Sequence, residues 1–126
     1  MSHRSRIGVI VLDCRSEDLA DAARFWSAAL GDDFKIDERG KYAFVEQDGY
    51  PRVLLQAVDH EPRVHLDVET DDQEAERDRL VALGAREVER VREWIVMEAP
   101  TGHRFCLVGP QGDDFPGDAA EWGASE

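Results

Sequence analysis

The sequence is short of cysteine, of basic residues and of long apolar runs. Its two cysteines, Cys14 and Cys106, are far apart and in no metal-ligand spacing, which predicts free thiols in a reducing compartment. The chain has 15 Lys and Arg residues against 28 Asp and Glu, and a formal net charge of -13. Such a surface repels nucleic-acid phosphates and anionic membranes. The apolar run Ile7–Leu12 is too short for a signal peptide or a membrane span. We therefore expect a soluble cytoplasmic protein with neither nucleic-acid nor membrane partners.

Several catalytic signatures are also missing. The sequence has no glycine-rich phosphate loop, no Gly-x-Ser-x-Gly and no His-Glu-x-x-His, so no nucleophile with its base is recognisable. The length of 126 residues suits one domain with a core of its own.

The order of expected elements occurs twice. An apolar strand is followed by a helix over Ser16–Leu30, and the alternating strand Val64–Val68 is followed by a helix over Asp71–Leu83. Both helices end in Ala-Leu-Gly, with Gly31 and Gly84 as the stops. Ser16 is the expected N-cap of the first helix. Thr70, followed three residues later by Gln73, is the expected capping box of the second.

Eight strands complete the two halves: Ile7–Leu12, Phe34–Asp37, Tyr42–Gln47, Arg52–Val58, Val64–Val68, Arg86–Val91, Trp94–Glu98 and Arg104–Val108. An internal repeat of about 53 residues follows from the recurrence, although two unrelated halves that share a helix stop would give a similar pattern. The predicted class is α+β, with modules at 7–58 and 63–108 forming one domain over 7–108. Residues 109–126 form an acidic tail, either frayed or an arm whose Phe115 and Trp122 pack on the domain or on a second subunit.

A resemblance to a known family rests on the order of elements and on four stretches: Leu12-Asp13-Cys14, Phe25-Trp26, Arg63-Val64-His65-Leu66-Asp67, and Pro100-Thr101-Gly102-His103-Arg104-Phe105-Cys106-Leu107. With these features the chain resembles the glyoxalase-like branch of the vicinal oxygen chelate superfamily, which includes glyoxalase I, extradiol dioxygenases and bleomycin resistance proteins. The resemblance implies two βαβββ modules whose mixed sheet curls into a cup, with the helices outside and a ligand inside. It also implies a homodimer.

The resemblance places four metal-ligand positions at Val9, Leu54, His65 and Cys106. Only His65 is retained as a normal ligand, because the side chains of Val9 and Leu54 have no donor atom. We therefore expect no metal and no cofactor. One divalent ion (Zn, Ni, Fe or Mn) in an altered ligand set is the alternative.

Strand parity predicts which side chains face away from the helices. On the strand at Arg63, the residues Val64, Leu66 and Val68 form the helix-facing side. The expected cup interior holds polar side chains from three strands: Arg52, Gln56, Arg63, His65, Asp67, Arg104 and Cys106, with Trp94 of a fourth strand at the rim. A structural role is the alternative for four of these residues. His65 would be hydrogen-bonded to Asp67 or Gln56, Arg63 and Arg104 would form solvated ion pairs, and Cys106 would be a small apolar filler.

Three hypotheses for function follow. The first is a metal-free protein that binds a small molecule in the cup. The second is a metal-dependent lyase or dioxygenase with an altered ligand set around His65. The third is a metal-free enzyme that uses His65 as general base, oriented by Asp67 or Gln56.

Overall fold

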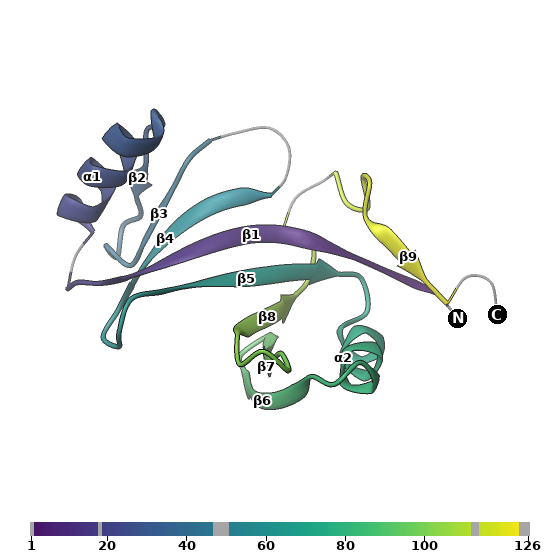
Figure 1. Cartoon of the computed structure of the whole chain (residues 1–126). Helices are drawn as coiled ribbons and strands as arrows, with labels where there is room; N and C mark the ends of the chain where they lie inside the picture. The colour runs from purple at the N-terminus through teal and green to yellow at the C-terminus, as the bar shows by residue number, and fades with distance from the viewer. Residues whose placement is uncertain (1, 18, 47–50, 112–113, 124–126) are drawn as a thin grey trace. The chain divides into compact units, whose positions relative to one another are not determined.

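The computed structural model describes residues 2–17, 19–46, 51–111 and 114–123. It is an α+β structure with two helices and nine strands that belong to one mixed sheet, so the predicted class is confirmed (Figure 1). The prediction of eight strands is wrong by one, because a short strand forms near the C-terminus. No helix in the described part of the chain is long and apolar enough to cross a membrane.

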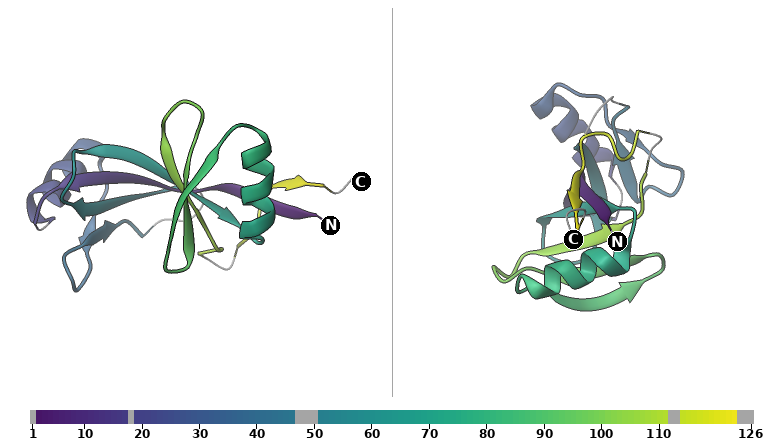
Figure 2. Two further views of the ribbon diagram at one scale, coloured as in Figure 1. Left: turned by 90° about the horizontal axis from the view of Figure 1, so that it is seen from below. Right: turned by 90° about the vertical axis from the view of Figure 1, so that its right-hand side faces the viewer.

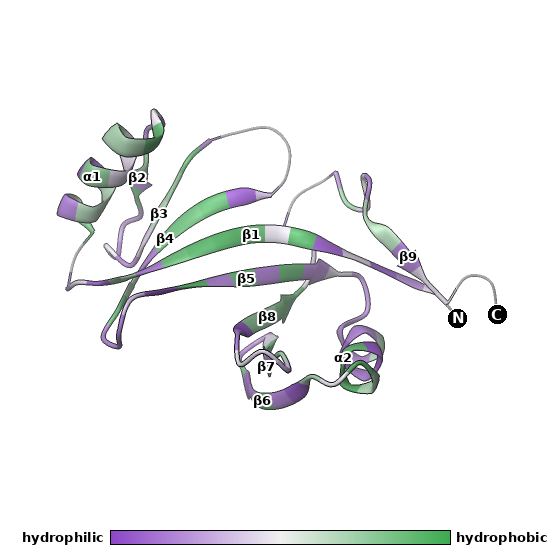
Figure 3. Cartoon of the chain, viewed as in Figure 1, coloured by the Kyte–Doolittle hydropathy of each residue, from purple (hydrophilic) through white to green (hydrophobic). Residues whose placement is uncertain are grey.

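The chain forms two compact units. Unit 1 consists of Met1–Gly8 and Leu66–Glu126, and unit 2 consists of Val9–His65. Two strands run through both of them, β1 (His3–Arg15) and β5 (Arg63–Thr70). β1 is much longer than its apolar run: its middle is hydrophobic and its N-terminal part hydrophilic (Figure 3). Hydrophobicity alone therefore predicted only the middle of this strand.

Unit 2 contains the helix α1 (Ala20–Leu30) and the strands β2 (Lys35–Ile36), β3 (Tyr42–Phe44) and β4 (Arg52–Val58). β1 pairs in parallel with β4, whose other edge pairs antiparallel with β3, and β2 closes the series. The residue Gln47 of the predicted third strand lies outside the described residues. The core is formed where α1 meets one sheet face, and its buried members are Leu19, Ala23, Phe34, Ala43 and Leu55.

The start of α1 differs from the prediction. Ser16 is not its N-cap: the helix begins at Ala20, and the N-cap is Leu19, which makes no side-chain cap hydrogen bond. Leu19 is fully buried, so packing fixes this helix end where a polar cap was expected. The predicted stop is confirmed, because Gly31 adopts the left-handed conformation with φ 74°.

Unit 1 contains α2 (Gln73–Ala82), β6 (Arg86–Val91), β7 (Trp94–Glu98), β8 (Arg104–Val108) and β9 (Ala120–Trp122). β5 pairs in parallel with β8, and the order continues antiparallel through β7 to β6. α2 packs against β6 and β8 (Figure 2). The buried core is formed by Ala85, Ile95, Met97 and Leu107, with Val68, Leu80 and Phe105 against it. Val64 was predicted to lie on the helix-facing side of β5, but it is 55% exposed.

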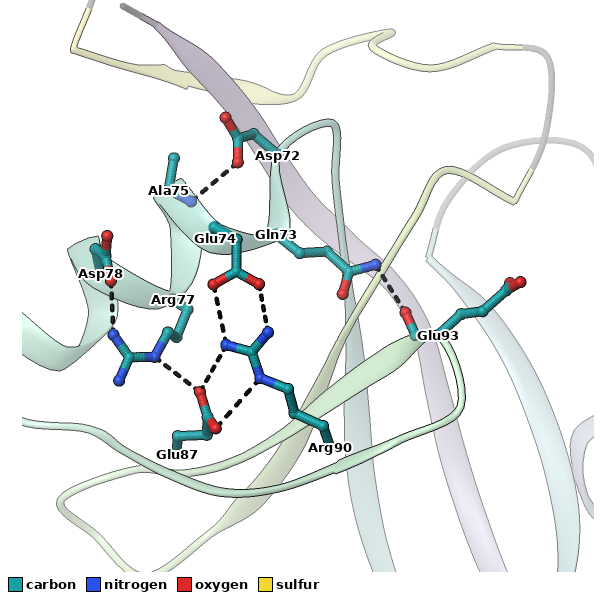
Figure 4. Close-up of polar contacts among 9 residues, drawn as sticks. All are labelled: Asp72, Gln73, Glu74, Ala75, Arg77, Asp78, Glu87, Arg90 and Glu93. Carbon is teal, nitrogen blue, oxygen red and sulfur yellow. Dashed lines mark hydrogen bonds and ion pairs between the residues drawn. The ribbon is translucent and has the colours of Figure 1, made fainter.

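The N-terminus of α2 is capped by Asp72, not by the predicted pair of Thr70 and Gln73. The Asp72 carboxylate accepts a hydrogen bond from the Ala75 backbone N–H at 3.0 Å. The Gln73 side chain instead donates to the Glu93 carbonyl oxygen (Figure 4). Thr70 accepts from the Asp72 N–H and so shapes the turn before the helix.

An ion-pair network joins α2 to β6 on the surface (Figure 4). The Arg90 guanidinium binds both Glu74 and Glu87, and Arg77 binds Glu87 and Asp78. The pKa of Glu74 is lowered, first by its hydrogen bonds from Arg90, and that of Glu87 is lowered by Arg90 and then by Arg77. These pairs are exposed or only partly buried, so we expect them to fix the register of helix and strand more than to stabilise the fold.

The C-terminal arm packs on the chain's own unit 1. β9 pairs antiparallel with residues His3–Ser5 of β1. The indole N–H of Trp122 donates to the Ser5 hydroxyl at 2.9 Å, and the Arg79 guanidinium lies 3.8 Å from the centre of the indole ring. The Arg6 guanidinium lies 5.2 Å from the centre of the Phe115 ring. Phe115 and Trp122 of the arm thus each contact an arginine of unit 1.

Candidate functional site

A buried carboxylate marks the candidate site in unit 2. Asp13 lies near the C-terminal end of β1 and is 5% exposed. The residues before and after it, Leu12 and Cys14, pack toward α1. Because side chains alternate along a strand, Asp13 points to the sheet face away from the helix. Val9 and Val11 share that face.

His65 is the nearest partner of Asp13. Its Nδ1 lies 3.0 Å from the Asp13 Oδ2, a hydrogen bond between residues 52 positions apart in the sequence. The imidazole is largely buried, with 16% of the side chain exposed. This contact places the ring on the sheet face away from α1, which agrees with the parity prediction for His65.

Two further groups surround the same carboxylate. The Arg63 Nε lies 3.7 Å and the His60 Nε2 lies 3.9 Å from the Asp13 Oδ2. An Arg63 terminal nitrogen also donates to the His60 Nε2 at 3.2 Å, and the His60 Nδ1 lies 2.8 Å from the Glu61 carbonyl oxygen. Three cationic or protonatable side chains therefore converge on one buried acid.

The strand register brings more side chains to this face. In the β1–β4 pair, Asp13 is opposite Gln56, Val11 is opposite Leu54, and Val9 is opposite Arg52. Neighbouring residues in register point to the same face of a sheet, so Arg52 and Gln56 share the face of Asp13. The apolar part of this sheet face continues on β3, where Tyr42 is opposite Gln56 and Phe44 is opposite Leu54. Tyr42 and Phe44 are 36% and 42% exposed.

The thiol beside this carboxylate is protected. Burial raises the pKa of the Cys14 thiol, and the charge of Asp13 raises it further. The thiol hydrogen bonds to the Leu12 carbonyl oxygen at 3.4 Å. Cys14 therefore faces the α1 core as a neutral thiol and offers no activated nucleophile.

The other predicted site residues lie in unit 1 and also share a sheet face. Asp67 is opposite Cys106 in the β5–β8 pair, and Cys106 is opposite Val96 in the β8–β7 pair. Trp94, two residues before Val96, is half-buried on the same face by strand parity. By register and strand parity, Asp67, Cys106 and Trp94 thus share one sheet face.

Arg104 forms an ion pair, which is the structural alternative to ligand binding that the sequence left open. Its Nε donates to the Glu98 carboxylate at 3.0 Å, and Arg86 binds the other oxygen of that carboxylate at 2.9 Å. The pKa of Glu98 is lowered, first by the hydrogen bond from Arg104 and then by that from Arg86. The Arg104 charge is therefore matched by an acid of the adjacent strand.

The residues present do not fit the ligand set that the resemblance implies. Val9 and Leu54 stand on the same face of β1 and β4, and their side chains consist of carbon alone. A catalytic zinc site uses three protein donors and keeps one open position. Of the four implied positions, only His65 and Cys106 have a side-chain donor.

Sequence reasoning missed four residues of this face: Asp13, His60, Tyr42 and Phe44. Asp13 has the same parity as Val9 and Val11, and this was the available signal. Tyr42 and Phe44 alternate with Ala43, which is fully buried in the core, so they point away from α1. His60 lies in the turn before β5, where no periodicity predicts a direction.

Comparisons with known proteins identify the family and the fold. A family model described as a glyoxalase-like domain matches residues 9–108. No curated protein matches the chain. Among solved structures, a glyoxalase/bleomycin resistance protein/dioxygenase superfamily member from Vibrio splendidus 12B01 has 20% identity and a TM-score of 0.55, over 82% of this chain and 98% of that one.

A second similar structure is 2,2',3-trihydroxybiphenyl 1,2-dioxygenase from the dibenzofuran-degrading Sphingomonas wittichii strain RW1. It has 19% identity and a TM-score of 0.62, over 87% of this chain. The chain spans only 42% of the length of that dioxygenase. At these identities the structural likeness shows the fold alone.

Proposed function

We propose that this chain, which belongs to the glyoxalase-like domain family, binds a small organic molecule on the sheet face of Asp13 and His65 and does so without a metal. The observation that carries the proposal is the buried Asp13–His65 hydrogen bond at 3.0 Å, on the side of the sheet that the helix leaves open. The family relationship supplies the fold, and the reaction, if any, depends on the residues of this face.

The composition of the face supports a small-molecule site. Polar groups from Gln56 and His65 stand beside the apolar surface of Leu54, Tyr42 and Phe44. Pockets for organic ligands combine an apolar lining with a few polar groups that fix orientation. A ligand with a planar apolar part would lie against the two aromatic rings and direct its polar group to His65.

The donor set supports binding without a metal. Val9 and Leu54 replace two ligands of the implied set, and the His65 imidazole is already hydrogen-bonded to a carboxylate of its own chain. If the protein is an enzyme, His65 and Asp13 are the pair of unit 2 that could transfer a proton. His65 would then act as general base with Asp13 as its orienting partner, in place of the Asp67 or Gln56 expected from the sequence.

A metal-dependent lyase or dioxygenase is the second candidate, and one observation favours it. Asp67 and Cys106 are opposite each other in the β5–β8 pair, and a carboxylate and a thiolate are both divalent-metal donors. We rank this candidate second because Val9 and Leu54, at two of the four implied ligand positions, have no donor atom.

We also propose that the protein is a homodimer. A two-fold pair is the commonest oligomer of a small domain. Because Phe115 and Trp122 pack on their own chain, the dimer would use another surface, such as the exposed Phe25 and Leu30 of α1. Light scattering that gives the monomer mass at micromolar concentration would rule the dimer out.

The test is a compound screen by thermal shift, with one histidine variant and a matched control. Compounds that raise the melting temperature of the wild type should lose most of that effect with His65→Gln. They should keep it with His103→Gln, since His103 is exposed and, in the described contacts, its side chain is hydrogen-bonded only to Thr101. Hits that are unaffected by His65→Gln would refute the proposed site.

A further inference from the structure

The pairing of Arg63 with its nearest carboxylate is incomplete. Arg15, Arg86 and Arg104 each have a carboxylate oxygen within hydrogen-bond distance, at 2.6, 2.9 and 3.0 Å. The Arg63 Nε lies 3.7 Å from the Asp13 Oδ2, which is too long for a hydrogen bond. The guanidinium of Arg63 is therefore attracted by the charge of a carboxylate that does not accept a hydrogen bond from it.

The hydrogen bond that Arg63 does form goes to an uncharged group. A terminal nitrogen of Arg63 donates to the His60 Nε2 at 3.2 Å. A guanidinium only donates, so this nitrogen of His60 carries a lone pair. The His60 Nδ1 lies 2.8 Å from the Glu61 carbonyl oxygen, which only accepts, so the proton of the imidazole is on Nδ1. His60 is thus a neutral acceptor and leaves the charge of Arg63 uncompensated.

Asp13 and His60 together hold the guanidinium in place. The Asp13 side chain is 3% exposed, whereas that of Arg63 is 51% exposed. A guanidinium has five N–H groups, and among the described residues only one of those of Arg63 has an acceptor, the His60 Nε2. Donors therefore remain for a group that arrives from solvent. An arginine already held by its own chain loses less conformational entropy when it binds a ligand.

An arginine of this chain can bind two acids at once. The Arg90 guanidinium, which is as exposed as that of Arg63, binds Glu74 at 2.5 Å and Glu87 at 3.0 Å. One acid at 3.7 Å therefore leaves Arg63 with the capacity for a second carboxylate. Within the described residues no side chain supplies that second carboxylate, although the whole chain has 28 Asp and Glu residues.

We infer that Arg63 binds the charged group of the ligand, and that the ligand of the unit 2 face is an organic carboxylate with a flat apolar body. The inference rests on the proposed function, because it names the ligand class of the same face. Asp13 and His60 are positioning residues that act through Arg63. The fork of guanidinium N–H groups matches the two oxygens of a carboxylate, whereas a neutral amide offers one acceptor and no charge.

The test compares 2-naphthoate with 2-naphthamide, which share a flat apolar ring system and differ in charge. Dissociation constants come from NMR titrations of ¹⁵N-labelled protein at neutral pH, followed at the backbone amide signals of β1 and β5. The wild type should bind 2-naphthoate about tenfold or more tightly than 2-naphthamide, which is the weight of a charge-assisted hydrogen bond. Arg63→Gln should abolish this preference, and Arg63→Lys should retain only part of it, because an ammonium keeps the charge without the fork.

Arg24→Gln is the matched control, since it removes the same charge from the same unit. Arg24 belongs to α1, its side chain is 74% exposed, and it is paired with Asp21 at 2.9 Å. The control should leave both dissociation constants unchanged. An equal loss of 2-naphthoate binding in Arg24→Gln and Arg63→Gln would show that only the net charge of the protein matters, and would overturn the inference.

Three further results would overturn the inference: equal affinities of the wild type for the two compounds, a preference that survives Arg63→Gln, or no binding of 2-naphthoate at millimolar concentrations. If Arg63→Gln fails to fold, Arg63→Lys decides, and an unchanged affinity for 2-naphthoate would refute the role of the guanidinium. Equal affinities that both fall in His65→Gln would leave the proposed function standing. Stoichiometric metal binding would refute the metal-free function, yet would leave a carboxylate preference that depends on Arg63, so the two failures are distinguishable.

Discussion

Replacing Gly8 by alanine should destabilise the fold because Gly8 makes room for a buried acid. A Cβ at position 8 would lie 2.5 Å from the Glu69 Cγ, 2.6 Å from its Oε2 and 2.7 Å from its Cδ. Glu69 is fully buried, and its Oε1 accepts two hydrogen bonds from the Arg6 guanidinium at 3.1 and 3.2 Å. The carboxylate therefore has little freedom to withdraw.

The magnitude follows from the cost of overpacking a buried site. Added methyl groups that force side chains out of place cost about 1–3 kcal/mol. If Glu69 rotates away instead, its hydrogen bonds with Arg6 are lost. The Arg6 side chain is only 7% exposed, so water does not replace them fully. We expect a loss of about 2 kcal/mol, in the middle of that range.

Urea unfolding gives the measurement, with Gly109→Ala as the control. No atom lies within 4 Å of a Cβ at position 109, so the control should stay within about 0.5 kcal/mol of the wild type. In a Glu69→Ala background the clash disappears, and Gly8→Ala should then cost little. A Gly8→Ala protein as stable as the Gly109→Ala control, or an equal loss in both backgrounds, would refute the steric account.

Two further predictions concern the contacts between β1, α2 and the C-terminal arm. Glu76 is buried, which raises its pKa, but hydrogen bonds led by that from Arg79 outweigh burial and lower it below the usual value. Glu76 therefore stabilises the fold above its unfolded pKa of about 4.3, and this contribution is lost as pH falls toward the lower folded pKa. Unfolding free energy should drop between about pH 5 and 3 in the wild type and less steeply in Glu76→Gln, and parallel profiles would contradict the assignment. Trp122→Phe removes the donor to Ser5 but keeps an aromatic ring for Arg79, so it should cost about 0.5–1.5 kcal/mol by urea unfolding, and an unchanged midpoint would show that β9 contributes nothing to stability.

The periodicity of the sequence predicted the fold well where one face of an element is buried. The strands β4, β6, β7 and β8 have the predicted bounds. Their ends could be predicted because apolar and polar residues alternate along the strand or because turn residues follow it. β9 was missed because the three residues Ala120–Trp122 are too few to reveal a period, and the N-terminal part of β1 with which they pair is polar. A strand formed by pairing at an edge leaves no periodic signal.

Helix starts were predicted less well, for a physical reason. Thr70 and Asp72 are both good N-cap residues, two positions apart, and the choice between them depends on backbone angles that long-range contacts fix. At α1 the burial of Leu19 overrides the nearby Ser16. Local sequence lists the possible caps, and tertiary packing selects one.

For the candidate site, the sequence predicted which sheet face each residue lies on, but not which residues contact one another. Parity placed His65 on the face away from the helix, and its contact with Asp13 agrees with that placement. It did not identify Asp13 as the partner, because the two residues are 52 positions apart and belong to strands whose register the sequence does not specify. Arg104 was expected on the face of Asp67 and Cys106, and its ion pair with Glu98 depends on a cross-strand register of the same kind.

The central claim is that this glyoxalase-like domain holds its ligand without a metal, and elemental analysis tests it most directly. Protein made in medium replete with Zn, Ni, Fe and Mn should be purified without chelators and measured by mass spectrometry of the elements, alongside His65→Gln. The account predicts far less than one metal ion per chain in both proteins, because Val9 and Leu54 offer no donor. One ion per chain in the wild type that is lost in His65→Gln would contradict the account and favour a metal-dependent lyase or dioxygenase.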